Sequence, residues 1–196
     1  MRASPKHRQQ MTVAREEMNV VWWIPPEYWD LTLKERQGVS AQTVEEVRTA
    51  FRDYQVFALV RVKMSLNGLV EMQSKEELLK HARFEVGGRT IAPVAPDKVP
   101  VALQTMLGAM KPMLSGALGQ LGQSMELVVY PVSQDHRQLI DLLKPGSFQF
   151  ALYDREFHWR TPLASLLPKK KDPKTGETFP GNYDYNPYTG EKLGAE

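Results

Sequence analysis

The sequence contains no cysteine among its 196 residues. This absence excludes disulfide bonds and thiolate chemistry. A chain without thiols is compatible with reducing and with oxidising compartments, so the absence does not locate the protein.

Long apolar segments are also missing. No stretch approaches the roughly 18–20 apolar residues of a membrane helix, and the polar N-terminus lacks the apolar core of a signal peptide. We therefore expect a cytoplasmic protein by default. An exported or periplasmic protein whose upstream signal has been removed is the alternative.

A strong net charge is a third missing feature. The formal charge is +2, so no field of the whole molecule marks the chain as a nucleic-acid binder. Positive charge is nevertheless concentrated at two places, namely residues 1–15, with Arg2, Lys6, Arg8, Arg15 and no acid, and the run Lys169, Lys170, Lys171. Short basic runs of this kind are either solvated ends or contacts to an anion, and both interpretations remain open.

Motifs for metal, cofactor or nucleophile chemistry are absent as well. The sequence has no HExxH, no GxSxG, no Walker loop and no GxGxxG between a strand and a helix. The four histidines are His7, His81, His136 and His158. No two of them have the sequence spacing of metal ligands. We therefore expect neither a cofactor nor a metal.

One segment places acid–base groups together. On an extended strand the side chains of alternate residues share a face, and the alternate residues here are Asp154, Glu156, His158 and Arg160. Two carboxylates beside an imidazole and a guanidinium form an acid–base set. An exposed strand face requires the same alternation of polar residues, so the set is either catalytic or simply solvated.

Periodicity predicts mixed helices and strands. Residues 40–54 have helical spacing, residues 55–64 form a strand with apolar side chains on both faces, and Asn67-Gly68 signals a turn. Ser74–Glu77 is a capping box that opens a short helix. Strands are expected around 84–86 and 125–132, with a turn or short helix at 135–143.

Two later segments have irregular patterns. Residues 96–122 show a helical stripe that includes Met106, Met110 and Met113, and we expect Pro112 to kink or break this helix. The stripe is core or, alternatively, a pliable binding groove. A last long strand covers 147–160, and its alternation changes phase near 153–155, which requires a bulge or a break.

These elements predict an α+β fold with an antiparallel β-sheet and helices packed on one face. A small C-terminal hairpin appendage completes the chain. We divide the sequence into a basic N-terminal arm at 1–19, loose or helical over 9–18, an α+β domain at 20–167 and a tail at 168–196.

The segment "WWIPPEYW" concentrates four large aromatic residues, which are Trp22, Trp23, Tyr28 and Trp29. Its two prolines favour an extended path. The aromatic side chains either fill the core or form a patch that binds a partner, because exposed aromatic residues dominate interface hot spots.

The tail contains a near-repeat. Asp172-Pro173-Lys174-Thr175-Gly176 is echoed by Asn186-Pro187-Tyr188-Thr189-Gly190. Both copies are good turn sequences, because proline presets the first turn angle and glycine accepts positive φ. Asp or Asn at the first position can accept backbone N–H bonds.

This frame resembles a short bacterial zinc ribbon over residues 169–193. The resemblance implies ligand positions at Asp172, Thr175, Asn186 and Thr189, and all four lack cysteine, so the site is degenerate. The resemblance implies that the tail has lost a zinc-binding free energy on the order of 10 kcal/mol, and the alternative is two ordinary turns with no ribbon ancestry. Aromatic and apolar side chains must then hold it, and the candidates are Phe179, Tyr183, Tyr185, Tyr188 and Leu193.

Three functional hypotheses follow. The first is a non-enzymatic interaction or assembly protein, a subunit or accessory factor of a larger complex or a homo-oligomer, which uses the tryptophan segment and the tail. The second is nucleic-acid binding by the basic arm and the tail aromatics. The third is an enzyme that uses residues 154–160, and it requires a concave pocket at that face.

Overall fold

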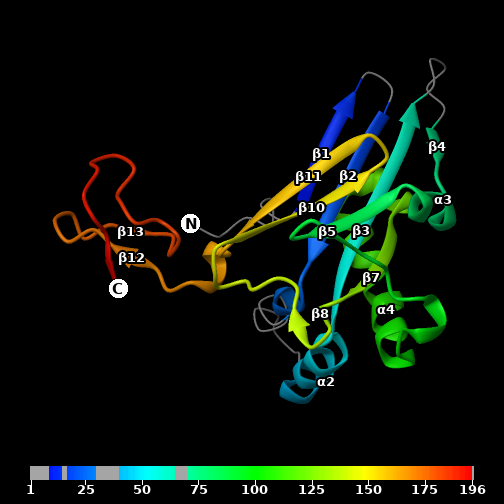
Figure 1. The fold of residues 1–196 in the computed structure, drawn as a ribbon, viewed down its shortest axis with the longest axis horizontal. Helices are drawn as coiled ribbons and strands as arrows, with labels where there is room; N and C mark the ends of the chain where they lie inside the picture. The colour runs from blue at the N-terminus through cyan, green and yellow to red at the C-terminus, as the bar shows by residue number, and fades with distance from the viewer. Residues whose placement is uncertain (1–8, 15–16, 30–39, 65–69, 196) are drawn as a thin grey trace.

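The computed structural model describes residues 9–14, 17–29, 40–64 and 70–195, and Figure 1 shows their arrangement. Most of these residues form three layers, which are a pair of helices, a five-stranded sheet and a four-stranded sheet. The Asn67-Gly68 turn and most of the basic N-terminal residues lie outside the described part.

All strands of the two main sheets pair antiparallel. The first sheet consists of β1 (Gln9–Ala14), β2 (Glu17–Ile24), β3 (Tyr54–Met64), β4 (Val70–Met72) and β7 (Glu126–Pro131). The second has the order β11 (Arg155–Thr161), β10 (Gly146–Leu152), β5 (Ala82–Val86) and β6 (Arg89–Ile91).

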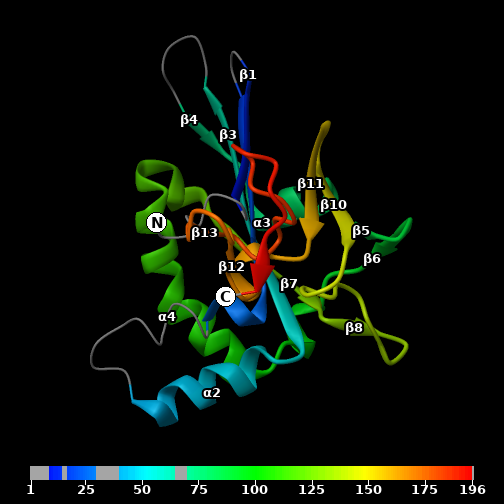
Figure 2. The same cartoon turned by 90° about the vertical axis from the view of Figure 1, so that its left-hand side faces the viewer.

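Strand β3 is the centre of the molecule because both of its faces are covered, as its sequence predicts. Val56, Ala58 and Val60 face a core shared with helices α2 (Ala41–Phe51) and α4 (Val101–Ala117). Phe57 and Leu59 face a second core, which the four-stranded sheet closes. Figure 2 shows α4 on one side of β3 and strands β5, β10 and β11 on the other.

The antiparallel sheet with helices on one face confirms the predicted α+β class. Helix α3 (Lys75–Lys80) begins after Ser74, whose hydroxyl accepts a bond from the Glu77 N–H at 3.3 Å, as the capping-box pattern predicts. The methionines of the stripe on α4 are half-buried against the core between α4 and the first sheet.

Several local predictions are wrong. Residues 9–14 are neither loose nor helical but form β1, so the sheet begins eleven residues before the predicted start of the domain at residue 20. The alternative of a break at Pro112 is wrong, because helix α4 runs on to Ala117, and burial of Leu103, Leu107 and Leu114 holds it against the sheet. That burial offsets the roughly 3 kcal/mol that an internal proline costs.

The predicted last strand is a hairpin. Strands β10 and β11 are joined by a two-residue turn at Tyr153 and Asp154, and Tyr153 adopts a φ of 57°. The change of phase predicted near 153–155 is therefore in the right place, and it corresponds to a turn that reverses the chain direction. Strands β8 (Ser133–Gln134) and β9 (Arg137–Gln138) form a further short hairpin where a turn or short helix is expected.

The tail forms a separate three-stranded sheet that lies apart from the two main sheets (Figure 1). Its strands are β12 (Lys170–Lys171), β13 (Thr178–Phe179) and β14 (Gly194–Ala195), and β12 lies in the centre. Of the predicted apolar side chains, Phe179 and Leu193 are buried. We call residues 168–195 the C-terminal module.

Candidate functional site

The tryptophan segment lies in the core. Trp22 faces the helices, Trp23 faces the second sheet, and Trp29 packs on Phe51 with ring centroids 4.8 Å apart. Tyr28 is half-buried. Residues 26–29 are helical, with Pro26 at the helix start, where proline is tolerated. Of the two alternatives, core packing is therefore correct for this segment, and its tryptophans are not available to a partner.

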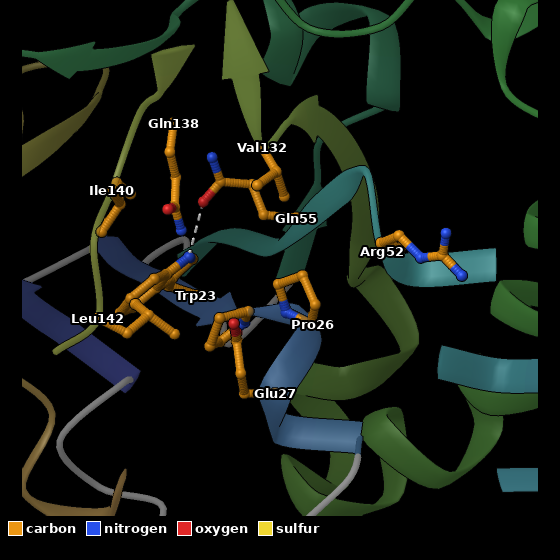
Figure 3. A pocket seen from close by; sticks show the side chains of 10 residues that line it. Trp23, Pro26, Glu27, Arg52, Gln55, Val132, Gln138, Ile140 and Leu142 are labelled. Atoms are coloured by element: carbon orange, nitrogen blue, oxygen red, sulfur yellow. Dashed lines mark hydrogen bonds between the residues drawn. The ribbon is translucent and has the colours of Figure 1, made fainter. Parts of the chain in front are cut away.

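A pocket lies beside Trp23, but it is too small to be a typical ligand site. Figure 3 shows its lining, in which the Trp23 indole N–H donates to Gln55 Oε1 at 3.0 Å. The Gln55 amide in turn donates to the Pro131 carbonyl at 3.0 Å. The pocket volume is about 140 Å³, below the roughly 300–1,000 Å³ of typical ligand pockets.

The predicted acid–base residues lie on an open surface. Glu156, His158 and Arg160 alternate along the exposed face of β11, and Asp154 lies in the preceding turn. His158 Nε2 is 3.6 Å from Glu156 Oε2, and the two side chains are 62% and 55% exposed. Asp154 borders an open depression that it shares with Arg61 and Tyr153, but Glu156, His158 and Arg160 line neither that depression nor the pocket beside Trp23. This geometry does not favour catalysis, because open water weakens each charge interaction.

Sequence reasoning assigned no role to Arg61, which is buried between the sheets. Its guanidinium donates to Glu17 Oε1 at 2.9 Å and lies 3.4 Å from the Tyr153 ring centroid. The His81 ring stacks on that of Tyr153, with the two centroids 4.1 Å apart. Burial raises the pKa of the Tyr153 phenol. Glu17 and Arg61 are 44 residues apart, and no local pattern signals such a pair.

This cluster borders an open depression lined by Glu17, Arg61, His81, Tyr153 and Asp154. The lining combines both signs of charge, and the guanidinium already has a carboxylate partner and an aromatic ring. Cation–π and ion-pair contacts of this kind join one sheet to the other. We interpret the cluster as the polar end of the inter-sheet core.

The two turns of the C-terminal module have the same hydrogen-bond pattern. In the first, Asp172 Oδ1 accepts from the N–H groups of Lys174 at 2.8 Å and Thr175 at 3.1 Å. In the second, Asn186 Oδ1 accepts from Tyr188 at 2.9 Å and Thr189 at 3.4 Å. The expectation that Asp and Asn side chains accept backbone N–H groups is confirmed.

Glycine closes both turns as expected. Gly176 and Gly190 both adopt a φ of 73°. Their N–H groups donate to the carbonyls of Asp172 at 2.9 Å and Asn186 at 2.8 Å. Because a side chain is strained at this φ, glycine is the residue that suits these positions.

One side-chain bond joins the two turns. Asn186 Nδ2 donates to Asp172 Oδ2 at 2.6 Å, and both residues are buried. A salt bridge between Lys174 and Glu191 at 2.8 Å connects the turns at the surface. The Asn186 bond, followed by the Thr175 N–H, lowers the pKa of Asp172.

The other two positions of the ribbon frame are occupied differently. Thr175 and Thr189 accept bonds through their hydroxyl oxygens from the N–H groups of Glu177 and Glu191, both at 3.3 Å. Among the described residues, no group of three or more His, Cys, Asp or Glu side chains is arranged to hold a metal ion.

The tyrosines of the module face solvent. Tyr183, Tyr185 and Tyr188 are 41%, 59% and 83% exposed. Phe179 is buried, and its ring centroid lies 6.5 Å from that of Tyr188. Of the predicted binding residues, the structure thus exposes these three tyrosines and buries Phe179 together with the tryptophans.

The basic run Lys169–Lys171 at the start of the module is partly neutralised. Lys170 Nζ lies 2.7 Å from Asp184 Oδ1. Residues 168–196 contain five lysines and five acidic residues, so the segment has no net charge. A polyanion that tracks along this surface would meet both signs, which weakens the electrostatic attraction on which such binding depends.

None of the described helices has both the length and the apolar character needed to cross a bilayer. No family model matches this sequence, and neither a curated protein nor a solved structure matches it.

Proposed function

We propose that the protein is a non-enzymatic interaction or assembly protein whose C-terminal module binds a partner protein. The observation that carries this proposal is the exposure of Tyr183, Tyr185 and Tyr188. Elsewhere in the described part of the chain, every tryptophan, tyrosine and phenylalanine is buried or half-buried.

Tyrosine suits this role because it supplies a large contact area with little loss of side-chain freedom. Tyrosine is also enriched among the residues that dominate binding energy. The paired turns of the module hold the backbone in place before binding, and preorganisation of this kind lowers the entropy lost on association.

The turn network also supports descent from a metal-binding ribbon that was kept for its shape. Asp172 and Asn186 accept the backbone N–H groups that sulfur accepts in such turns, and in the proposed frame their direct bond takes the role of the metal in joining the two turns. This origin is our proposal, and it explains why a contact module of fewer than thirty residues persists without cysteine.

The test is affinity capture from native extract, identified by mass spectrometry, with full-length protein as bait. The triple variant Y183S/Y185S/Y188S removes the aromatic surface. V101S/L143S is the matched control, because Val101 and Leu143 are exposed apolar residues outside the module at 78% and 58%.

We expect a protein that is retained by wild type and by the control and is lost from the triple variant. Two-dimensional NMR of the triple variant checks that the module remains folded. Equal capture by the triple variant, or capture that nuclease treatment abolishes, would overturn the proposal.

A further inference from the structure

The open depression lined by Glu17, Arg61, His81, Tyr153 and Asp154 has the size of a ligand site. Its volume is about 460 Å³, within the roughly 300–1,000 Å³ of typical ligand pockets. The lining side chains come from β2, from β3, from the residue after α3 and from the turn between β10 and β11. Both main sheets therefore contribute to one concave surface.

The buried polar groups beside this depression are incompletely satisfied. Arg61 is 5% exposed, and its Nη2 donates to Glu17 Oε1 at 2.9 Å, but its Nε and Nη1 have no hydrogen-bond partner in the described part of the chain. Asn19 lies opposite Arg61 in the register of β2 and β3, and its buried Oδ1 likewise lacks a partner there. Because buried polar groups are nearly always hydrogen-bonded, these adjacent donors and acceptor indicate a missing group that both accepts and donates.

Tyr153 connects these groups to the depression. Its ring centroid lies 3.4 Å from Arg61 Cζ, and its side chain also lines the depression. Tyr153 adopts a φ of 57°, which is unfavourable for a bulky residue, and its buried hydroxyl has no partner among the described residues. Strain of this kind is typical of functional sites. A ligand that displaces the ring would reach the remaining N–H groups of Arg61.

The charges at the depression have both signs. Arg61 supplies the positive charge, and the carboxylates are those of Glu17 and Asp154, whose side chains are 30% and 67% exposed. An anion alone would be repelled by both carboxylates, and a cation alone would leave the N–H groups of Arg61 without an acceptor. A molecule that carries a carboxylate and an ammonium group a few bonds apart avoids both costs.

We propose that the depression binds a small zwitterion of the amino-acid class. The ligand carboxylate accepts hydrogen bonds from the Arg61 guanidinium. The ligand ammonium group donates to Asn19 Oδ1 and is attracted by the carboxylates of Glu17 and Asp154. The cluster thereby binds a ligand in addition to joining the two sheets. This proposal does not depend on the tyrosine surface of the C-terminal module.

NMR titration of the full chain tests the ligand class. The standard amino acids are added singly, and we expect at least one to shift the backbone amide signals of Arg61, His81 and Tyr153 in a saturable way. For that amino acid, the matched acid without the amine and the matched amine without the carboxylate (for alanine, propionate and ethylamine) should bind about tenfold more weakly or worse. The absence of a saturable shift with any amino acid at millimolar concentration, or equal binding of either matched probe, would overturn the proposal.

Substitutions test the two ends of the ligand separately. R61K keeps the charge but removes Nε and Nη1, so amino-acid binding should weaken about tenfold or more. D154N changes an exposed side chain and leaves the fold intact, and the dissociation constant should rise about threefold to fivefold for the amino acid but not for the matched acid. D97N is the matched control, because Asp97 lies in η2 (Pro96–Lys98), outside the depression, and should bind as wild type does. Wild-type affinity in D154N would contradict the proposal even if R61K failed to fold.

Discussion

Asn186 Nδ2 donates a hydrogen bond to Asp172 Oδ2 over 2.6 Å, between two residues that are both buried. Asp172 also organises its own turn through its second carboxylate oxygen, Oδ1, and Asn186 organises the other turn through its amide oxygen, Oδ1. The bonds within the first turn, the bonds within the second turn and the bond between the turns therefore all depend on these two side chains. We expect the stability of the C-terminal module to depend mainly on them.

The substitution N186D isolates the bond between the turns. It keeps the oxygen that caps the second turn and replaces the donor by a carboxylate oxygen facing Asp172. We expect amide hydrogen exchange within 170–195 to accelerate about tenfold or more, because a buried polar contact becomes a repulsion. Exchange measured by NMR or mass spectrometry checks this, with the β3 amides as the internal control. Unchanged protection in the module would contradict the assigned role.

The module should lose structure in acid. Its hydrogen bonds lower the pKa of Asp172 from an ordinary value of about 3.9. A lowered pKa in the folded state contributes stability above the ordinary value, and this stability is lost as the pH falls through the folded pKa. We therefore expect the module to be fully ordered at pH 5–7 and to loosen below about pH 4. NMR signals of the Asn186 side-chain amide report the change, and D172N should abolish this component of the pH dependence.

Restoring thiolates should create a metal site. In the variant D172C/T175C/N186C/T189C we expect Co²⁺ to bind tetrahedrally and to give thiolate-to-cobalt charge-transfer absorption, whereas wild type should give none. The expectation follows from the proposed ribbon frame and from the close approach of positions 172 and 186. D172C/N186C supplies two ligands and should bind more weakly. A folded four-cysteine variant without this absorption would contradict the ribbon frame.

Substitution of Phe57 should destabilise the core between the two sheets. Its ring contacts Phe84, Tyr130, Phe150 and Trp159. We expect F57A to lower the free energy of unfolding by about 3–5 kcal/mol, because it leaves a cavity among large rings. Urea denaturation followed by tryptophan fluorescence measures the change. L143A, at an exposed position, should remain within about 0.5 kcal/mol of wild type.

Local patterns predicted the parts of the fold that depend on local rules. The two-sided character of β3 follows from its alternation, and the cap at Ser74 follows from a four-residue motif. The turns at Asp172 and Asn186 likewise follow from the Pro and Gly positions within each copy. These features require no knowledge of which segments meet in space.

The missed features depend on long-range pairing. Strand β1 has a short and mixed sequence and is ordered by its partner β2. The turn at Tyr153-Asp154 contains no glycine or asparagine, so it gives no hairpin signal. Nothing near Arg61 indicates that Glu17 is its partner. The burial of the tryptophans likewise depends on the two layers that enclose β2.

The atoms that join the two turns of the C-terminal module are carboxylate and amide oxygens and nitrogens, none of which reacts with peroxide or competes for a soft metal. The module should therefore keep its shape during oxidative stress and in zinc-depleted medium, where thiolate-ligated ribbons come apart. It is a candidate for grafting onto other scaffolds as a small, thiol-free display of three tyrosines.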